Sequence, residues 1–286
     1  MAKREEWEEG NRLITELLET GKPVSIARTS LGAEMLSGVC LRRRCAMPTQ
    51  LEYQLKNNSG IYGSRSDLYR YPPVYLEAMV GSDAIGIWRH PSFILAEQET
   101  LPAGIPTFQA QAVEPFYACE AGERPWSHSL LGKKVLVISP FVESFQKQLE
   151  AGFSMFNDGR RLFLEGQEFV FYKAFMTHGG NELHKSWLET IGIMMTEISK
   201  LEFDVAILGC GGYGVPLCGY IKKNLGKSAI YIGGGMQLMF GVMGGRWENG
   251  EFWQQRAREG AKFIRPGARE QLPGGANQRI ENGCYW

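Results

Sequence analysis

The segment from Phe203 to Trp247 constrains the fold of this chain more than any other part of the sequence. An apolar run over residues 205–208 leads into a glycine cluster, and a helical stretch follows it. A second apolar run, over residues 229–232, leads into three consecutive glycines. The pattern predicts a strand–helix–strand unit with glycines at the carboxyl ends of both strands. Ligands of open α/β sheets bind at those ends of the strands.

The two glycine clusters predict a site for a phosphate or a nucleotide diphosphate. Gly209, Gly211 and Gly214 fit the pattern G-x-G-x-x-G, and Gly233 and Gly234 begin the second cluster. Glycine lets a backbone approach a phosphate closely, and a helix N-terminus offers unpaired N–H groups. Tight packing of strands against helices would place glycines in the same pattern, so that alternative stays open. A nicotinamide site would need an acidic residue at the end of the second strand, and none follows it.

Charge and cysteine usage exclude several function classes. The 286 residues carry 31 Lys and Arg against 31 Asp and Glu, so the net charge is zero. Such a chain lacks the basic excess that binds nucleic acid, and we expect no nucleic-acid partner. The charged beginning of the sequence and the lack of a long apolar stretch predict neither a secretory signal nor a membrane span. Six scattered cysteines indicate free thiols in a reducing cytoplasm.

Apolar runs and helical patterns alternate along the chain, which predicts an α/β fold with an open, mostly parallel sheet and helices on both faces. We expect one domain over 1–286, with an N-terminal part about 1–125, a glycine-rich nucleotide-binding part about 126–250 and a polar tail over 251–286 that wraps over the body. The expected strands lie near 23–28, 82–88, 108–113, 133–138, 168–175, 205–208 and 229–232. The expected helices lie near 4–20, from 32 onward, over 47–80 in two pieces, and near 143–156, 187–201 and 214–226.

Four segments carry a resemblance to a known family. They read VLVISPFVESFQKQ, FDVAILGCGGYGVPLCGYIKK, AIYIGGGMQLMFGVMGGRW and a terminal GCYW. These segments resemble a family of bacterial proteins that is similar to the GT-D type of glycosyltransferase, whose fold is a Rossmann-like α/β domain. The resemblance is dense over residues 126–247 and thin before residue 90. It implies an enzyme that binds a nucleoside diphosphate sugar and transfers the sugar to a glycan or another hydroxyl acceptor.

The resemblance also implies a metal motif near the N-terminus, where GT-D enzymes have a strand ending in Arg followed by Asp-x-Glu. Arg28 and Glu34 fit that pattern, but Gly32 stands in the place of the Asp. The resemblance therefore implies Arg28 as a contact of the nucleotide sugar and Glu34 as a catalytic residue or a ligand of Mn²⁺ or Mg²⁺. One carboxylate is a poor site for a divalent cation, so the metal requirement stays open. Glu34 is equally typical of an acid that stabilises the first turn of a helix.

Further contacts to the nucleotide sugar are expected within the glycine-rich segments. Arg246 could place its guanidinium against a diphosphate, and Trp247 could place its indole against a base or a sugar. A buried tryptophan beside a paired arginine is the alternative for these two residues. Tyr213 and Gln237 lie within or beside the two glycine clusters, and we expect them at the same site.

Three other polar residues are candidates for the site. Ser139 follows the strand expected over 133–138, and Ser144 lies in the first turn of the next helix, where N–H groups bind anions. Simple capping of that helix would need the same serines. Asp83 lies at the start of an expected strand and is a candidate general base, although it could equally cap a turn.

Three function classes remain. The first is a glycosyltransferase, the second is a non-catalytic nucleotide-binding or scaffold protein of the same fold, and the third is a Rossmann-type oxidoreductase. The glycosyltransferase is the leading hypothesis, and the glycine in the place of a metal-binding Asp is the feature that favours the second class. The lack of a ribose-binding acid after the second strand argues against the third.

Overall fold

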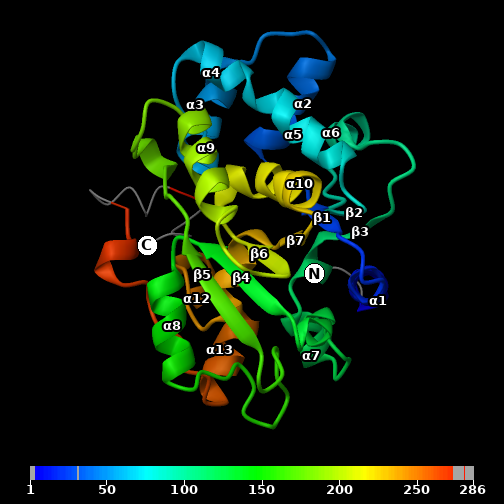
Figure 1. Ribbon diagram of the computed structural model, residues 1–286, viewed down its shortest axis with the longest axis vertical. Helices are drawn as coiled ribbons and strands as arrows, with labels where there is room; N and C mark the ends of the chain where they lie inside the picture. The colour runs from blue at the N-terminus through cyan, green and yellow to red at the C-terminus, as the bar shows by residue number, and fades with distance from the viewer. Residues whose placement is uncertain (1–3, 31, 273–279, 281–286) are drawn as a thin grey trace.

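The computed structural model, which describes residues 4–30, 32–272 and 280, is an α/β structure built on one open sheet (Figure 1). Seven strands form this sheet in the order β3-β2-β1-β7-β6-β4-β5, and every neighbouring pair is parallel. The strands are β1 (Ser25–Arg28), β2 (Ala84–Ile87), β3 (Thr107–Gln109), β4 (Lys134–Ser139), β5 (Glu168–Lys173), β6 (Val205–Leu208) and β7 (Ser228–Tyr231). The expected α/β class and open sheet are confirmed, and the observed strand pairs are all parallel rather than mostly so.

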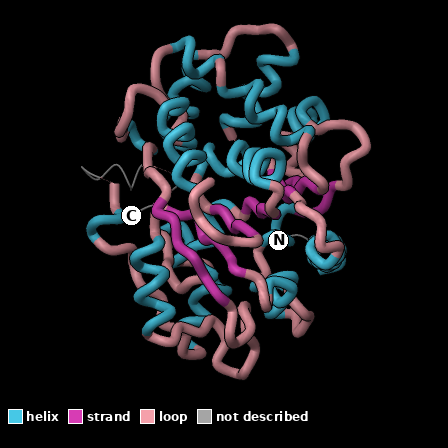
Figure 2. Tube along the Cα trace, viewed as in Figure 1, coloured by secondary structure: helices cyan, strands magenta, loops and turns pink. Residues whose placement is uncertain are grey.

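Helices cover both faces of the sheet, as Figure 2 shows by the cyan segments on either side of the magenta strands. One face carries α2 (Ala33–Arg42), α3 (Thr49–Ser59), α4 (Arg65–Tyr69), α5 (Tyr71–Val80), α6 (Ile94–Thr100), α9 (Trp187–Ile198) and α10 (Gly214–Leu225). The other face carries α1 (Arg4–Glu19), α7 (Phe116–Glu120), α8 (Val142–Glu150), α11 (Met236–Met239), α12 (Gly245–Glu248) and α13 (Glu251–Arg258). None of the described helices has the length and apolar composition needed to cross a lipid bilayer.

The apolar strands form because both of their faces are buried. In β4, Val135 and Val137 pack into the hydrophobic core on one face, and Leu136 and Ile138 pack into the core on the other. All four side chains are fully buried. This alternation follows from the two-residue period of a strand, and it explains why a central parallel strand has a continuous apolar sequence.

Local signals explain where several expected helices differ from the structure. The helix expected over 143–156 ends at Glu150, because Gly152 adopts a φ of 70° and ends the turn. The two helical pieces expected over 47–80 are three helices, since Ser64 makes a capping box that starts a separate helix, α4. The first residues of the expected wrapping tail over 251–286 form α13, whose Trp253 is buried. The terminal GCYW lies outside the described residues.

The strand order brings four loops to one edge of the sheet. Because all neighbouring strands are parallel, the loops that follow β1, β7, β6 and β4 leave the sheet side by side. The helix after β6 packs on one face, while the helix after β4 packs on the other. A crevice opens in an open α/β sheet where neighbouring connections leave on opposite faces, and ligands bind there.

Candidate functional site

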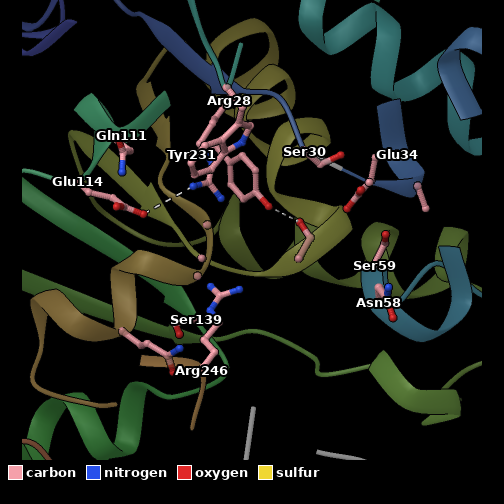
Figure 3. A pocket seen from close by; sticks show the side chains of 18 of the residues that line it. Arg28, Ser30, Glu34, Asn58, Ser59, Gln111, Glu114, Ser139, Tyr231 and Arg246 are labelled. Atoms are coloured by element: carbon pink, nitrogen blue, oxygen red, sulfur yellow. Dashed lines mark hydrogen bonds and ion pairs between the residues drawn. The ribbon is translucent and has the colours of Figure 1, made fainter. Parts of the chain in front are cut away.

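A cavity of about 700 Å³ opens at the carboxyl edge of the sheet (Figure 3). This volume is typical of a site for a small organic ligand. The structure brings most of the expected site residues together in its lining: Arg28, Glu34, Ser139, Gly209, Gly211, Gly233, Gly234, Gln237, Arg246 and Trp247. Asp83, Ser144, Tyr213 and Gly214 do not line it. Six aromatic side chains share the lining with these polar groups: Trp88, Phe93, Tyr117, Phe141, Tyr231 and Trp247.

Arg28 is the last residue of β1, and its side chain is held between two aromatic rings. Its Cζ atom lies 5.1 Å from the centre of the Trp88 ring and 5.7 Å from the centre of the Tyr231 ring. The Trp88 indole donates a hydrogen bond of 2.9 Å to the carbonyl of Thr29, which fixes the ring against the loop after β1. A guanidinium held in this way is ordered before any ligand arrives, so less side-chain entropy is lost on binding.

Glu114 forms an ion pair with Arg28 in the cavity lining, and we did not predict this residue from the sequence. Its Oε1 atom lies 3.6 Å from Nη1 of Arg28, and only 11% of its side chain is exposed. Burial raises the pKa of Glu114, although the positive charges of Arg28 and Arg246 act in the opposite direction. Glu114 directly follows the strand expected near 108–113, so an acid at a carboxyl strand end was the signal that could have found it.

Two arginines approach the backbone of the second glycine cluster closely. Gly233 has a φ of 74°, and a Cβ atom there would lie 2.8 Å from Cζ of Arg28. A Cβ atom on Gly234 would collide with the guanidinium of Arg246. The Arg246 guanidinium stacks on the indole of Trp247, 4.0 Å from the ring centre. The two glycines therefore lie between two cationic groups at the end of β7.

The first glycine cluster combines cavity lining with packing. Gly211 has a φ of 59°, and a Cβ atom there would collide with the imidazole of His178. The carbonyl of Gly211 accepts a hydrogen bond of 3.0 Å from the Tyr231 hydroxyl. A Cβ atom on Gly214 would collide with the Tyr231 ring, and Gly214 does not line the cavity. For Gly214 the structure therefore supports strand–helix packing instead of the expected ligand contact.

Tyr213 also lies away from the cavity. Its ring is fully buried, and its hydroxyl donates to the carbonyl of Gly60 at 3.1 Å and lies 2.8 Å from Oγ1 of Thr177. These contacts fix the loop after β6 to the end of α3. The expectation that Tyr213 contacts a nucleotide sugar is therefore replaced by a role in holding the glycine cluster in place.

The two serines near α8 have different surroundings. Ser139 lines the cavity at the end of β4. Ser144 is buried at the beginning of α8, where its backbone N–H and its hydroxyl donate to the carboxylate of Glu270. The backbone N–H of Glu143 donates to the same carboxylate at 2.8 Å. The anion-binding position expected at Ser144 is thus filled by a carboxylate of the chain itself.

Asp83 lies at the opposite edge of the sheet. It precedes β2, so it sits at the amino end of a parallel strand while the cavity lies at the carboxyl ends. Its Oδ2 atom accepts a hydrogen bond of 2.7 Å from the backbone N–H of Ser25, and Oδ1 lies 2.8 Å from Nζ of Lys222. Asp83 therefore fixes the start of the strands, and we no longer expect it to act as a general base.

Glu34 projects into the cavity from the first turn of α2 (Figure 3). A Cβ atom on Gly32 would lie 3.7 Å from Oε2 of Glu34, so a side chain at position 32 would point to the same region. Within the described part of the chain, no group of three or more His, Cys, Asp or Glu residues is arranged to bind a metal ion. Glu34 is thus the one carboxylate that residues 28–34 contribute to the cavity, and one carboxylate alone is a poor site for a divalent cation.

Two other titratable side chains near the glycine clusters are uncharged at neutral pH. Burial raises the pKa of the Cys210 thiol well above its usual range, so this cysteine remains a neutral packing residue. Burial lowers the pKa of His178 to about 4, so its imidazole is uncharged at neutral pH. Because the thiolate is the nucleophilic form of cysteine, the neutral Cys210 thiol is a poor nucleophile.

Comparison with protein-family models finds no match, and comparisons with curated proteins and with solved structures find no similar protein. The site is therefore interpreted from its own geometry. Two guanidiniums beside a glycine pair suit an anionic group with several oxygens, because arginine donates several charge-assisted hydrogen bonds in one plane. The aromatic rings around them suit a flat base or the apolar face of a sugar.

Proposed function

We propose that this protein is a glycosyltransferase that binds a nucleoside diphosphate sugar in the cavity at the carboxyl edge of the sheet. The observation that carries the proposal is the pair of arginines, Arg28 and Arg246, on either side of Gly233 and Gly234. Their two positive charges match a diphosphate, and the half-buried indole of Trp247, which lines the cavity, offers an apolar surface for the rest of the nucleotide.

The same groups would act during transfer. An acceptor hydroxyl oxygen would attack the anomeric carbon of the sugar, and the bond from that carbon to the diphosphate oxygen would break. The diphosphate would leave with the electron pair, and Arg28 and Arg246 would stabilise its growing negative charge. The proton of the acceptor hydroxyl would pass to the carboxylate of Glu34, which projects into the cavity. Asp83 has no part in this scheme because it lies at the other edge of the sheet.

A divalent cation such as Mn²⁺ or Mg²⁺ would find one carboxylate, Glu34, in the segment that resembles the metal motif of GT-D enzymes. Such an ion would depend on substrate phosphate oxygens for most of its coordination. The two arginines already supply positive charge at the diphosphate position, so the proposed transfer does not rely on a resident metal.

A second candidate is a nucleotide-binding protein of the same fold without transfer activity. It is favoured by one specific observation, the glycine at position 32 in place of a second carboxylate beside Glu34. Both candidates predict nucleotide binding, and only the first predicts turnover.

The test is titration calorimetry with UDP, GDP, ADP and dTDP. Arg246→Ala should weaken the tightest of these interactions about 10- to 150-fold, the effect of losing a charge-assisted hydrogen bond worth about 1.5–3 kcal/mol. Arg65→Ala is the matched control, since Arg65 also stacks on an aromatic ring, at 5.7 Å from Tyr69, but lies outside the cavity. The proposed site would be refuted if Arg246→Ala left the dissociation constant unchanged, or if none of the four nucleotides bound the wild type.

Turnover separates the two candidates. The protein should slowly release the nucleoside diphosphate from its preferred nucleotide sugar, because water can replace the acceptor hydroxyl. Glu34→Gln should lower that rate about 10²- to 10⁴-fold, the usual effect of a general base. Tight nucleotide binding without any release of nucleoside diphosphate from a nucleotide sugar would favour the non-catalytic candidate.

A further inference from the structure

A second, much smaller cavity adjoins the large one. Its volume is about 10 Å³, and it shares Arg28, Ser30, Glu34, Gly211 and Tyr231 with the lining of the large cavity. Two tyrosines of α5, Tyr71 and Tyr75, complete its wall together with Gly212 and Val215. Because so many residues are shared, the small cavity is a recess of the proposed site.

Three buried polar atoms around this recess have no hydrogen-bond partner within the described residues. They are Nε of Arg28, Oγ of Ser30 and Oη of Tyr75, and the Tyr75 side chain is only 2% exposed. The Tyr75 hydroxyl lies near the backbone of Ser30 but makes no hydrogen bond of normal geometry. Native proteins rarely leave buried polar atoms unpaired, because each costs the full desolvation of that group.

The neighbouring tyrosines show that the recess differs from ordinary packing. The hydroxyl of Tyr71 donates to the carbonyl of Gly212 at 2.9 Å, and the hydroxyl of Tyr231 donates to the carbonyl of Gly211 at 3.0 Å. Tyr75 makes no such bond, and burial raises its pKa far above neutrality, so its hydroxyl keeps its proton. An occupant of the recess would therefore meet donors from Arg28, Ser30 and Tyr75.

The size of the recess restricts the occupant. A volume of about one water-sized sphere admits a water molecule or a single hydroxyl group and excludes a phosphate or a ring. Arg28 lies at the mouth of the recess and, under the proposed function, binds the diphosphate. In a nucleotide sugar, the hydroxyl groups of the sugar lie within a few bonds of the diphosphate, and each is small enough for the recess.

We propose that this recess binds one hydroxyl group of the donor sugar, so that Ser30 and Tyr75 select donors with a free hydroxyl at one ring position. The inference rests on the proposed function and names the part of the substrate that the recess recognises. Removing that hydroxyl from the substrate should weaken binding about 10- to 100-fold, because a donor such as Arg28 would lose a charge-assisted contact.

The experiment uses the nucleoside diphosphate that binds most tightly, its glucose conjugate, and the 2-, 3-, 4- and 6-deoxyglucose conjugates. Dissociation constants are measured for the wild type, Tyr75→Phe and Ser30→Ala. Tyr220→Phe is the matched control, since the Tyr220 hydroxyl donates to the carbonyl of Met195 and does not line either cavity.

One deoxy conjugate should bind the wild type about 10- to 100-fold more weakly than the glucose conjugate, and the others should bind equally well. Tyr75→Phe and Ser30→Ala should reduce that difference severalfold and leave binding of the nucleoside diphosphate alone unchanged. If all four deoxy conjugates bind the wild type equally well, the inference is overturned while the proposed function stands. The same holds if Tyr75→Phe and Ser30→Ala weaken binding of the nucleoside diphosphate as much as binding of its glucose conjugate. Failure of every nucleoside diphosphate to bind would overturn the proposed function and the inference together.

Discussion

Glu114→Gln should strengthen nucleoside diphosphate binding. Glu114 is the buried counter-ion of Arg28, with 3.6 Å between Oε1 and Nη1, and its own pKa is raised by burial. A diphosphate that contacts Arg28 would bring negative charge near this carboxylate. Glutamine has nearly the same shape as glutamate and no charge, so the variant removes the repulsion while keeping the packing against Gly235.

The structure sets the size of this effect. A phosphate on the side of Arg28 away from Glu114 would lie about 7 Å from the carboxylate, roughly twice the observed separation of the ion pair. At effective dielectric constants between about 20 and 80, two unit charges at that distance repel each other by about 0.6–2.4 kcal/mol. The variant should therefore bind the diphosphate about 3- to 60-fold more tightly at a pH where Glu114 is ionised.

Titration calorimetry at pH 8 and at lower pH measures the effect. The wild-type affinity should rise as the pH falls toward the raised pKa of Glu114, because protonation removes the same negative charge. The affinity of the Glu114→Gln variant should lack that rise. Glu120→Gln is the matched control, since Glu120 pairs with Arg256 at 3.0 Å but lies outside the cavity. If Glu114→Gln bound the diphosphate equally or more weakly than the wild type at pH 8, the proposed repulsion between Glu114 and the diphosphate would be refuted.

Three further variants test individual residues. Gly211→Ala should lower the free energy of unfolding by about 2–4 kcal/mol in urea denaturation, because Gly211 has a positive φ and a Cβ atom there would collide with His178. Unchanged stability would contradict this packing. Gly32→Asp should raise Mn²⁺ affinity in calorimetry by adding an oxygen donor beside Glu34, and no gain would mean that the two positions do not share a metal. Asp83→Asn should lower the free energy of unfolding by about 1–2 kcal/mol and leave nucleotide binding and turnover unchanged. If release of the nucleoside diphosphate became about 100-fold slower, Asp83 would be a catalytic residue after all.

The sequence predicted the strand–helix–strand unit well because its signals are local. The strand over 205–208 has the expected bounds, since four apolar residues lie between polar Asp204 and a glycine. Gly226 ends α10 with a φ of 63°, as expected for a glycine after a helix. The same local signals placed Arg28 at the end of β1, although its aromatic neighbours come from elsewhere in the chain.

What the sequence did not predict depends on contacts between distant residues. Glu270 reaches the N-terminus of α8 from 126 positions away, so nothing near Ser144 indicated that its N–H groups were already satisfied. Glu114 follows β3, which lies two strands away from β1 in the sheet, so its ion pair with Arg28 depends on how the chain packs after β3. The position of Asp83 could have been predicted from the sequence. A residue that precedes a parallel strand lies at the amino edge of the sheet, away from the ligand crevice.

The most direct test of the central claim is a crystal structure with the nucleoside diphosphate that binds most tightly in calorimetry. We predict electron density for the diphosphate at Gly233 and Gly234, with phosphate oxygens within hydrogen-bond distance of the guanidiniums of Arg28 and Arg246. Density for the nucleotide at any other place on the protein, or a diphosphate that contacts neither arginine, would contradict it.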